Sequence, residues 1–436
     1  MLAASPNPRR PPCLVVGGGF SGLSAALLLS RAGFPVEVVE GSSELGGLAG
    51  RVEFRGIACD LGSHRLHPAG LRAPVLAELA EEGMFLRRPR RGRLLLRGHA
   101  VPYPPRLLPL ARALGPRRAL ATAAHLALRG VHPKWEAEEN DGPEDVGFEE
   151  FVRRRVGPAA YEAFYRPYAE KVWGLPPDQL SQSVAKKRVS TSNPLRALQG
   201  GEFAYPRGGI SELIQTLADK LRARGVVLRT DCAVEPGGHK GPVLWSGPLD
   251  GLVPTELEHR GLTLVFLAIP LSRVSSVDTW YAPEERFWFG RVSELGNFSP
   301  ALRRVGETVL CVEIPQGGAR PGLQYTGDRL PELVAQLATA GILPGGVHPI
   351  AAEQLFLPRV YPLYPRGWRA VWTDAMERVA QGGDVFPFGR QGLFLHCNLD
   401  HCAVIAAQLV DHLERGGTAA AWAGGADRFL GLRVRD

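Results

Sequence analysis

The sequence has few cysteines, and none of them stand in a Cys-x-x-Cys pair. Its six cysteines are scattered along 436 residues without regular spacing. This pattern is typical of reduced, mostly buried thiols in a cytoplasmic protein. We therefore predict a cytoplasmic protein with no metal site.

Long hydrophobic runs are also lacking. The longest ones, Ser24 to Leu29 and Leu262 to Pro270, are too short to span a bilayer, so no transmembrane segment is predicted. Residues 1–12 carry their charges after the apolar residues, which excludes a secretory signal and predicts a disordered leader. The leucine- and arginine-rich segment Leu107 to Leu128 has two interpretations: an amphipathic helix that packs on its own domain, or a peripheral membrane contact.

The net charge is +7, with a pI near 9.2, and much of it comes from arginine. The cluster Arg87 to Arg93 has no interleaved aromatic residues, and the sequence has no nucleic-acid-binding signature, so no nucleic-acid partner is predicted. A solvated arginine-rich surface and a field that attracts anionic substrates remain as interpretations.

Glycine, by contrast, is abundant and arranged in a motif near the N-terminus. An apolar strand from Cys13 leads into Gly17-Gly-Gly-Phe-Ser-Gly22, an alanine- and leucine-rich helix follows, and a second strand ends at Glu40, 18 residues beyond Gly22. In such a unit the first glycine permits a tight turn, the second lets the backbone approach a pyrophosphate, and the third lets helix and strand pack closely. The terminal acid accepts hydrogen bonds from ribose hydroxyls. The motif predicts a dinucleotide site.

The rest of the chain predicts two interleaved domains of an α/β protein. A glycine-rich loop (Gly46, Gly47) with Arg51 suits a second approach to a pyrophosphate. Helical periodicity dominates residues 71–199, a sheet is predicted between Trp280 and Trp372, and Gly389 to Leu395 is predicted as a strand. We assign 13–70, 200–275 and 375–415 to the nucleotide-binding domain, and 71–199 and 276–374 to a substrate domain.

These motifs, with Tyr205-Pro-Arg-Gly-Gly-Ile210, Trp245-Ser-Gly-Pro-Leu-Asp250 and Asp400, resemble the FAD-dependent amine oxidase and protoporphyrinogen-oxidase-like flavoproteins over most of the chain. The resemblance implies a glutathione-reductase-type, Rossmann-like FAD domain interleaved with a mixed α+β substrate domain. It also implies FAD as a non-covalent cofactor, with Cys59 or Cys397 as the attachment points if the flavin were covalent. The cofactor-binding residues that it implies are Gly17, Gly19, Phe20, Ser21, Gly22, Glu40, Gly41, Gly46, Gly47, Arg51, Gly62, Ser63, Val234, Gly389, Arg390, Leu399 and Asp400.

A narrower similarity is to the UDP-galactopyranose mutase-like branch. The run Gly62-Ser-His-Arg-Leu-His67 is similar to the flavin loop of the mutases, which implies that His64, Arg65 and His67 lie along the flavin ring as catalytic candidates. The two histidines have an equally weighted structural interpretation. The C-terminal motif at His396 to Asp400 departs from the relatives, which puts the mutase substrate in doubt but not the flavin. Substrate candidates are Arg166, Tyr168, Trp173, Arg207, Tyr364 and Arg366.

Three functions are compatible with these residues. In the first, an oxidoreductase passes hydride from a small-molecule substrate to flavin N5. Amine oxidation in this fold often involves a lysine near the flavin, for which Lys171, Lys186 and Lys187 are candidates by type, although surface lysines are the simpler interpretation. In the second, reduced flavin attacks the anomeric carbon of a nucleotide sugar without net redox change. The third is a flavin-binding scaffold without activity. The oligomeric state is not predicted.

Overall fold

A computed structural model describes residues 10–103, 106–130, 146–188, 201–235, 237–316 and 325–432. The chain divides into two compact units. The first contains residues 1–87, 203–257 and 370–436, and the second contains residues 88–202 and 258–369. The expected leader lies outside the described residues as far as residue 9; Arg10 forms an ion pair with Glu414.

The first unit contains a five-stranded, fully parallel sheet in the order β16-β10-β1-β2-β9. Counted along the chain and read from β9 to β16, the order is 3-2-1-4-5. This is a doubly wound arrangement, in which a ligand crevice lies where the strand order reverses, here between β1 and β10. Buried valines and leucines form most of the central strands, as expected for a sheet covered on both faces. The strands are β1 (Cys13–Val16), β2 (Val36–Val39), β9 (Val227–Arg229), β10 (Val243–Trp245) and β16 (Val385–Pro387).

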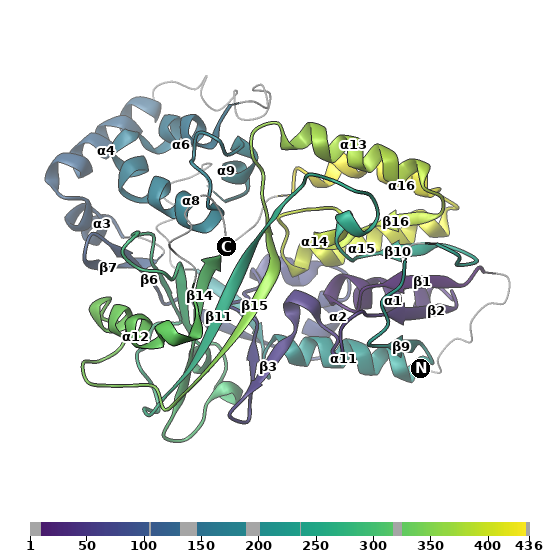
Figure 1. The fold of residues 1–436 in the computed structure, drawn as a ribbon, viewed down its shortest axis with the longest axis horizontal. Coiled ribbons are helices and arrows are strands. Elements are labelled where there is room, and N and C mark those ends of the chain that lie inside the picture. Colours follow the sequence, from purple (N-terminus) through teal and green to yellow (C-terminus); the bar gives the residue numbers. More distant parts are fainter. Residues whose placement is uncertain are drawn as a thin grey trace. The chain divides into compact units, whose positions relative to one another are not determined.

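Helices surround this sheet, and α1 packs against both α11 and α15 (Figure 1). Helix α1 is apolar nearly all round, since nine of its twelve residues are buried, and this explains its central place. A small antiparallel hairpin of β3 (Arg51–Phe54) and β4 (Ile57–Asp60) follows the glycine-rich loop at Gly46 and Gly47. The helices are α1 (Phe20–Arg31), α2 (Leu76–Glu81), α11 (Ile210–Ala223), α13 (Trp368–Gln381), α14 (Gly389–Gly392), α15 (Leu399–Glu414) and α16 (Ala419–Gly424).

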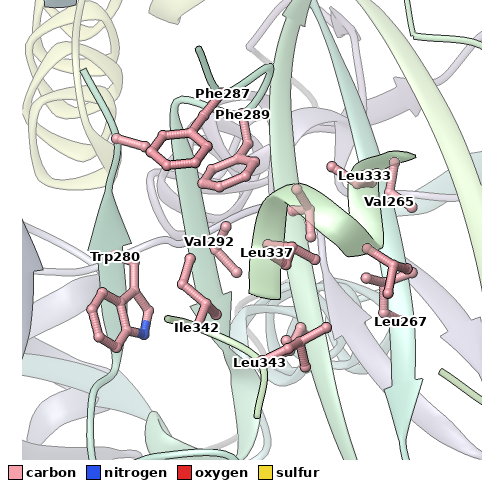
Figure 2. Close-up of a cluster of buried hydrophobic side chains, with 14 of the residues drawn as sticks. Val265, Leu267, Trp280, Phe287, Phe289, Val292, Leu333, Leu337, Ile342 and Leu343 are labelled. Carbon is pink, nitrogen blue, oxygen red and sulfur yellow. The ribbon is translucent and has the colours of Figure 1, made fainter. Parts of the chain in front are cut away.

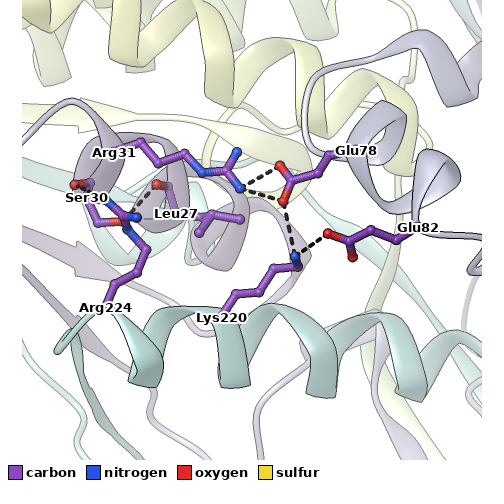
Figure 3. Close-up of polar contacts among 7 residues, drawn as sticks. All are labelled: Leu27, Ser30, Arg31, Glu78, Glu82, Lys220 and Arg224. Carbon is purple, nitrogen blue, oxygen red and sulfur yellow. Dashed lines mark hydrogen bonds and ion pairs between the residues drawn. The ribbon is translucent and has the colours of Figure 1, made fainter. Parts of the chain in front are cut away.

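Hydrogen bonds and ion pairs between partly exposed side chains link three of these helices, α1, α2 and α11 (Figure 3). Glu78 of α2 accepts from Arg31 Nη2 of α1 at 2.7 Å and from Lys220 Nζ of α11 at 3.1 Å, and Lys220 also contacts Glu82 at 2.6 Å. Arg31 and Lys220 outweigh partial burial and hold the pKa of Glu78 below its usual value.

The second unit is built on a seven-stranded sheet in the order β15-β11-β14-β13-β12-β6-β7. All its pairs are antiparallel except β12 with β6. This confirms the sheet predicted between Trp280 and Trp372. The strands are β6 (Gly92–Leu96), β7 (His99–Tyr103), β11 (His259–Ile269), β12 (Thr279–Tyr281), β13 (Arg291–Glu294), β14 (Thr308–Gln316) and β15 (Ala351–Pro362), while β5 (Phe85–Pro89) pairs with β8 (Glu202–Pro206) in a separate ribbon.

One face of this sheet carries the core of the second unit (Figure 2). Val265 and Leu267 of β11 face Leu333 and Leu337 of α12, and Phe287 stacks on Phe289 at 5.2 Å between ring centroids. Alternate residues of the strands point to this face. The other residues of β11 and β14 are buried as well, apart from His259, so these two strands are covered on both faces. The remaining helices of the unit are α3 (Leu107–Leu114), α4 (Pro116–Gly130), α6 (Phe148–Val156), α7 (Pro158–Ala160), α8 (Arg166–Trp173), α9 (Gln182–Arg188) and α12 (Leu330–Thr339), with a π-helical turn at Tyr161–Tyr165.

Several details differ from the expectations. Residues 71–87 cluster with the first unit, and residues 258–275 with the second, because β11 pairs along its length with β14 and β15. The predicted helical block at 71–199 also contains β5, β6 and β7. The strand predicted at Gly389 to Leu395 is wrong: the strand is β16, which ends at Pro387, and Gly389 opens the short helix α14 with a φ of +73°.

Candidate functional site

The glycine turn after β1 lies at the reversal point of the parallel sheet, and two of its glycines are required by the fold itself. Gly17 has a φ of +104°, and a Cβ there would lie 2.3 Å from Ser246 Oγ. A Cβ on Gly22 would lie 1.8 Å from the Gly17 carbonyl oxygen. These two glycines therefore allow the close approach of α1 to β1 that the motif predicts.

Gly19 is different, because nothing in the fold requires it to be a glycine. Its φ is −73°, which any residue adopts, and a Cβ would make only ordinary contacts, the nearest at 3.6 Å from the Gly46 carbonyl oxygen. As the N-cap of α1 it has no side chain to satisfy the first amides of that helix, and the first turn has no acidic residue. The first backbone amides of this twelve-residue helix therefore have no side-chain cap, and such amides at a helix N-terminus can bind phosphate.

The Gly46-Gly47 loop lies directly beside this turn. Gly46 donates its N–H to the Gly18 carbonyl at 2.9 Å and forms a parallel bridge with Gly19. The structure therefore brings together the two glycine-rich segments that the sequence predicts at one pyrophosphate. Arg51, in contrast, is exposed on β3.

Glu40 follows β2 and faces the same turn. Its Oε2 accepts from the Gly18 N–H at 2.7 Å, and its Oε1 accepts from the Ser42 N–H at 2.9 Å and from Ser42 Oγ at 2.7 Å. The loop that carries Val234 lies alongside, because Cys232 donates its N–H to the Glu40 carbonyl at 2.9 Å and Val234 packs on the cluster around Val39. These contacts orient the carboxylate at the carboxyl end of the sheet, where a ribose is expected.

A second helix N-terminus, that of α15, lies in the same unit. Asn398 caps it in a reciprocal capping box with His401, and Asp400 stands in its first turn. A Cβ on Gly70 would lie 2.8 Å from Asp400, so the segment after His67 passes directly over this turn. Gly389 is equally close to α1, since its Cβ would lie 2.5 Å from Ser21 Oγ. Arg390 donates to the Cys397 carbonyl at 2.7 Å and holds the loop before the helix.

The candidate histidines lie in the loop between β4 and Pro68. His67 Nδ1 accepts from the Ala69 N–H at 3.1 Å and caps a short 3₁₀ helix, so its neutral form carries the proton on Nε2. His64 Nε2 lies 3.1 Å from the Leu61 carbonyl oxygen. The Arg65 guanidinium carbon lies 5.1 Å from the centre of the Phe203 ring. Gly62 opens the loop with a φ of +101°.

Two polar residues near this site were missed by sequence reasoning. Ser246, directly after β10, directs its hydroxyl at the Val16 and Gly17 carbonyls, at 3.0 and 3.2 Å, and so fixes the glycine turn. Asp60 is fully buried at the start of α11, where it accepts from the Ile210 N–H at 2.9 Å and from the Tyr205 hydroxyl. Burial raises the pKa of Asp60 to about 6 against these hydrogen bonds. Two features of the sequence could have indicated Asp60: the alternation of Ile57 and Cys59 in the strand before it, and the motif Tyr205-Pro-Arg-Gly-Gly-Ile210, whose first and last residues contact it.

In the second unit, the predicted substrate residues are dispersed. Trp173 is buried with its edge on Tyr361, 5.7 Å between centroids, and Tyr364 stacks flat on Trp368 at 3.7 Å. Arg166 pairs with two glutamates of its own helical segment at 3.2 Å each. Tyr168 stacks on Phe164, and the backbone N–H of Arg366 donates to the Gln179 carbonyl at 2.8 Å. In the first unit, Arg207 Nε donates to the Gly83 carbonyl at 2.8 Å.

Lys171 of α8 is a buried structural cation. Its Nζ donates to the backbone carbonyls of Ala282, at 2.6 Å, of Phe289, at 3.2 Å, and of Glu284. Burial lowers the pKa of Lys171 to about 7, and the nearby carboxylates of Glu284 and Glu285 oppose this shift. The interpretation of Lys171 as a surface lysine was wrong, because its side chain is buried and hydrogen-bonds α8 to the segment 282–289.

Arg260, which the sequence did not single out, is buried at the start of β11. Its Nη2 donates to the Lys171 carbonyl at 3.1 Å, whereas Nε and Nη1 have no hydrogen-bond partner among the described residues. Desolvation lowers the pKa of Arg260 to about 10. A buried guanidinium with unused donors is the group that an anionic ligand satisfies. A separate cavity of about 500 Å³ lies on the same unit, lined by His259, Gly261, Thr263, Gln316, Tyr325, Gln354, Phe356 and Pro358.

Comparison with known proteins agrees with this geometry. The family model described as flavin containing amine oxidoreductase matches residues 20–235. A probable UDP-galactopyranose mutase of Klebsiella pneumoniae is 25% identical over 248 residues, 54% of this chain and 60% of that protein. A putative flavin-containing monoamine oxidase of Mycobacterium tuberculosis is 30% identical over 224 residues, 48% of each chain. The chain thus matches about half the length of these curated relatives.

The fold is shared over nearly the whole chain. A crystal structure of reduced UDP-galactopyranose mutase superposes with a TM-score of 0.81 at 18% identity, covering 97% of this chain and 98% of that one. A putative protoporphyrinogen oxidase from Exiguobacterium superposes with a TM-score of 0.67 at 18% identity, covering 93% and 99%. In the part of the chain that the structure describes, no helix is both long and apolar enough to cross a membrane.

Proposed function

We propose that this chain is an FAD-dependent oxidoreductase of the flavin-containing amine oxidoreductase family, that it works in the cytoplasm and that it acts on a small molecule. The observation that carries the proposal is the contrast between the glycines of the turn. Gly17 and Gly22 are required by packing within the chain, while a Cβ on Gly19 would make only ordinary contacts, the nearest at 3.6 Å from the Gly46 carbonyl oxygen. A glycine kept where the fold does not need one fits the close approach of a pyrophosphate.

The residues that would hold FAD lie along the carboxyl ends of the parallel strands and at the N-terminus of α15. The bare amides of α1 would bind the pyrophosphate, with the Gly46-Gly47 loop on its other side. Glu40 would accept hydrogen bonds from the adenosine ribose, and the Val234 loop would contact the adenine. Asp400 and the amides of α15 would hold the ribityl and flavin end. FAD supplies hydride acceptance at N5 or, when reduced, a nucleophilic N5.

His64 and His67 would lie beside the flavin, in the loop that passes near Asp400. Because His67 Nδ1 accepts from the Ala69 N–H, its neutral form would carry the N–H at Nε2. His64 would hold or move a proton as the charge of the flavin changes. Arg65 would keep the loop in place through its stacking on Phe203.

A second candidate function is a non-redox mutase that acts on a nucleotide sugar. Arg260 favours it, because two unused donors on a buried guanidinium suit a diphosphate better than a cationic amine, which the same charge would repel. In this case Arg260 would bind and orient the anionic part of the substrate.

Turnover under two redox conditions separates the candidates. Purified holoenzyme is given nucleotide sugars and primary or secondary amines, first with the flavin oxidised and then after reduction with dithionite. An oxidoreductase consumes an electron acceptor in proportion to substrate. A mutase isomerises a nucleotide sugar only after reduction, and Arg260→Met then raises its KM for the sugar nucleotide. Acceptor consumption with an amine would rule out the mutase.

A further inference from the structure

Among the described residues, helices α3 and α4 of the second unit bury one side, the inner one. Leu110, Ala113, Leu114 and Ala119 form a small core with Leu94, Leu96 and Val101 of the adjoining strands. This inner side explains why the two helices fold where they do. Their outer side has a different composition.

The outer side exposes large leucines. Leu107 is 67% exposed, Leu108 75%, Leu120 73% and Leu128 64%. On α4, Leu120, Ala124 and Leu128 recur every four residues and are all exposed, so they form one continuous apolar stripe along the helix. Contiguous exposed apolar surface of this kind marks an interaction site.

The same segment is strongly basic. Residues 106–130 contain five arginines (Arg106, Arg112, Arg117, Arg118 and Arg129) and no aspartate or glutamate. Arg117 begins the turn from which the leucine stripe continues, and both it and Arg118 are exposed. The partner of this surface must therefore accept leucine side chains and carry negative charge. Nucleic acid supplies the charge but not the apolar contact.

We propose that this leucine–arginine face, made of Leu107, Leu108, Leu120 and Leu128 with Arg112, Arg117 and Arg118, binds the surface of an anionic lipid bilayer. Leucines enter the boundary between headgroups and acyl chains, and the arginine stems extend along the helix while their guanidinium groups reach the phosphates. Helix α4, at fifteen residues, is about 22 Å long, shorter than the hydrocarbon core, so it lies in the plane of the interface.

Vesicle cosedimentation of the full-length protein tests this. The probes are phosphatidylcholine vesicles with and without phosphatidylserine, at low and at physiological salt. The wild type is expected to sediment with the anionic vesicles, more weakly at higher salt and with pure phosphatidylcholine. Removing charge through Arg117→Gln with Arg118→Gln should weaken binding by about fivefold for each arginine.

The leucines are tested by replacing Leu107, Leu108, Leu120 and Leu128 with serine together. This variant should lose at least about tenfold in vesicle affinity. Ile350→Ser with Phe356→Ser is the matched control, since both residues are exposed and apolar in the same unit, 53% and 56%, without lying on these helices. Circular dichroism confirms that each variant is folded.

Three results would overturn the proposal. The wild type could fail to bind anionic vesicles. The four-leucine variant could bind them as well as the wild type does. Light scattering could also find a dimer that the four serines dissociate in a protein without vesicle affinity, which would assign the leucine–arginine face to self-association.

Discussion

At the scale of single residues, the glycine turn contains glycines that the fold needs and one, Gly19, that only a ligand would need. A glycine motif predicts a phosphate site because three glycines stand at set positions, yet the sequence cannot say which glycine serves which purpose. The structure does so for Gly17 and Gly22, whose Cβ atoms would collide with neighbours inside the chain. Gly19 meets no such obstacle. Substitutions at Gly19 and Gly22 should therefore fail in different ways.

Gly19→Ala should leave the protein folded and weaken FAD binding by at least roughly tenfold, because the added methyl occupies the approach of the pyrophosphate. Gly22→Ala should instead lower the free energy of unfolding by about 1–3 kcal/mol, since its Cβ would overlap the Gly17 carbonyl. Thermal unfolding and flavin titration of both variants measure the two effects. Full FAD affinity in folded Gly19→Ala protein would contradict the assignment.

Asp60 predicts an unusual pH dependence of stability. Its pKa of about 6 in the folded protein exceeds the ordinary 3.8, so the folded state holds this proton more tightly than the unfolded state does. The contribution of Asp60 is therefore greatest below about pH 4 and is lost as the pH rises to about 6, by up to about 3 kcal/mol. Asp60→Asn, which cannot titrate, is the reference.

Urea unfolding of wild type and Asp60→Asn between pH 4 and pH 7 measures this difference, because the other acids titrate in both proteins. The wild type should gain stability relative to the variant as the pH falls. A difference that does not change with pH would show that Asp60 titrates in the folded protein as it does in the unfolded chain.

At the scale of elements, Lys171 and Lys220 link helices to other parts of their units through hydrogen bonds and ion pairs. The sequence predicts α1 from the alanine- and leucine-rich run that follows the glycine turn. It missed β6 and β7 within a block of helices, although these two strands form a local hairpin; the second partner of β6, β12, lies far along the chain. It also misassigned Gly389 to Leu395, where the positive φ of Gly389 decides the local structure. A short stretch of sequence shows neither the distant partner of a strand nor the backbone angle of a residue.

Lys171 is predicted to stabilise the second unit and to take no part in chemistry. Lys171→Met would leave the carbonyls of Ala282, Glu284 and Phe289 buried without their donor, and should lower the free energy of unfolding by about 3–5 kcal/mol. Lys240→Met, at an exposed position, should change it little. If Lys171→Met protein kept wild-type stability and lost turnover with bound flavin, the lysine would be catalytic.

The contact of Glu78 with α1 and α11 should be worth much less. Glu78→Gln is expected to cost about 1 kcal/mol or below at neutral pH, because the ion pairs are partly exposed. The loss should shrink as the pH falls through the ordinary pKa of glutamate and disappear below the lowered pKa of Glu78 in the folded protein, where the wild-type carboxyl is also neutral. Glu81→Gln on the same exposed helix is the control, and urea unfolding at two pH values is the measurement.

At the scale of the whole molecule, the fold class and the cofactor follow from the sequence, while the substrate does not. The 3-2-1-4-5 order of the parallel sheet and its glycine turn agree with the predicted nucleotide-binding domain, and the chain's relatives share that fold. Substrate residues could not be chosen by type. Buried Trp173 and Tyr364 stack on other aromatic rings, Arg166 is neutralised by nearby glutamates, and Arg260 became a candidate only through its burial.

The visible absorption spectrum of the purified protein, repeated on the supernatant after heat denaturation, shows whether this chain binds FAD and whether the attachment is non-covalent. A flavin-dependent enzyme predicts flavin bands in the native protein and their full release into the supernatant, with FAD rather than FMN identified there by chromatography. A colourless protein that also fails to take up added FAD would contradict the account. Colour that stays with the denatured chain would contradict the non-covalent attachment.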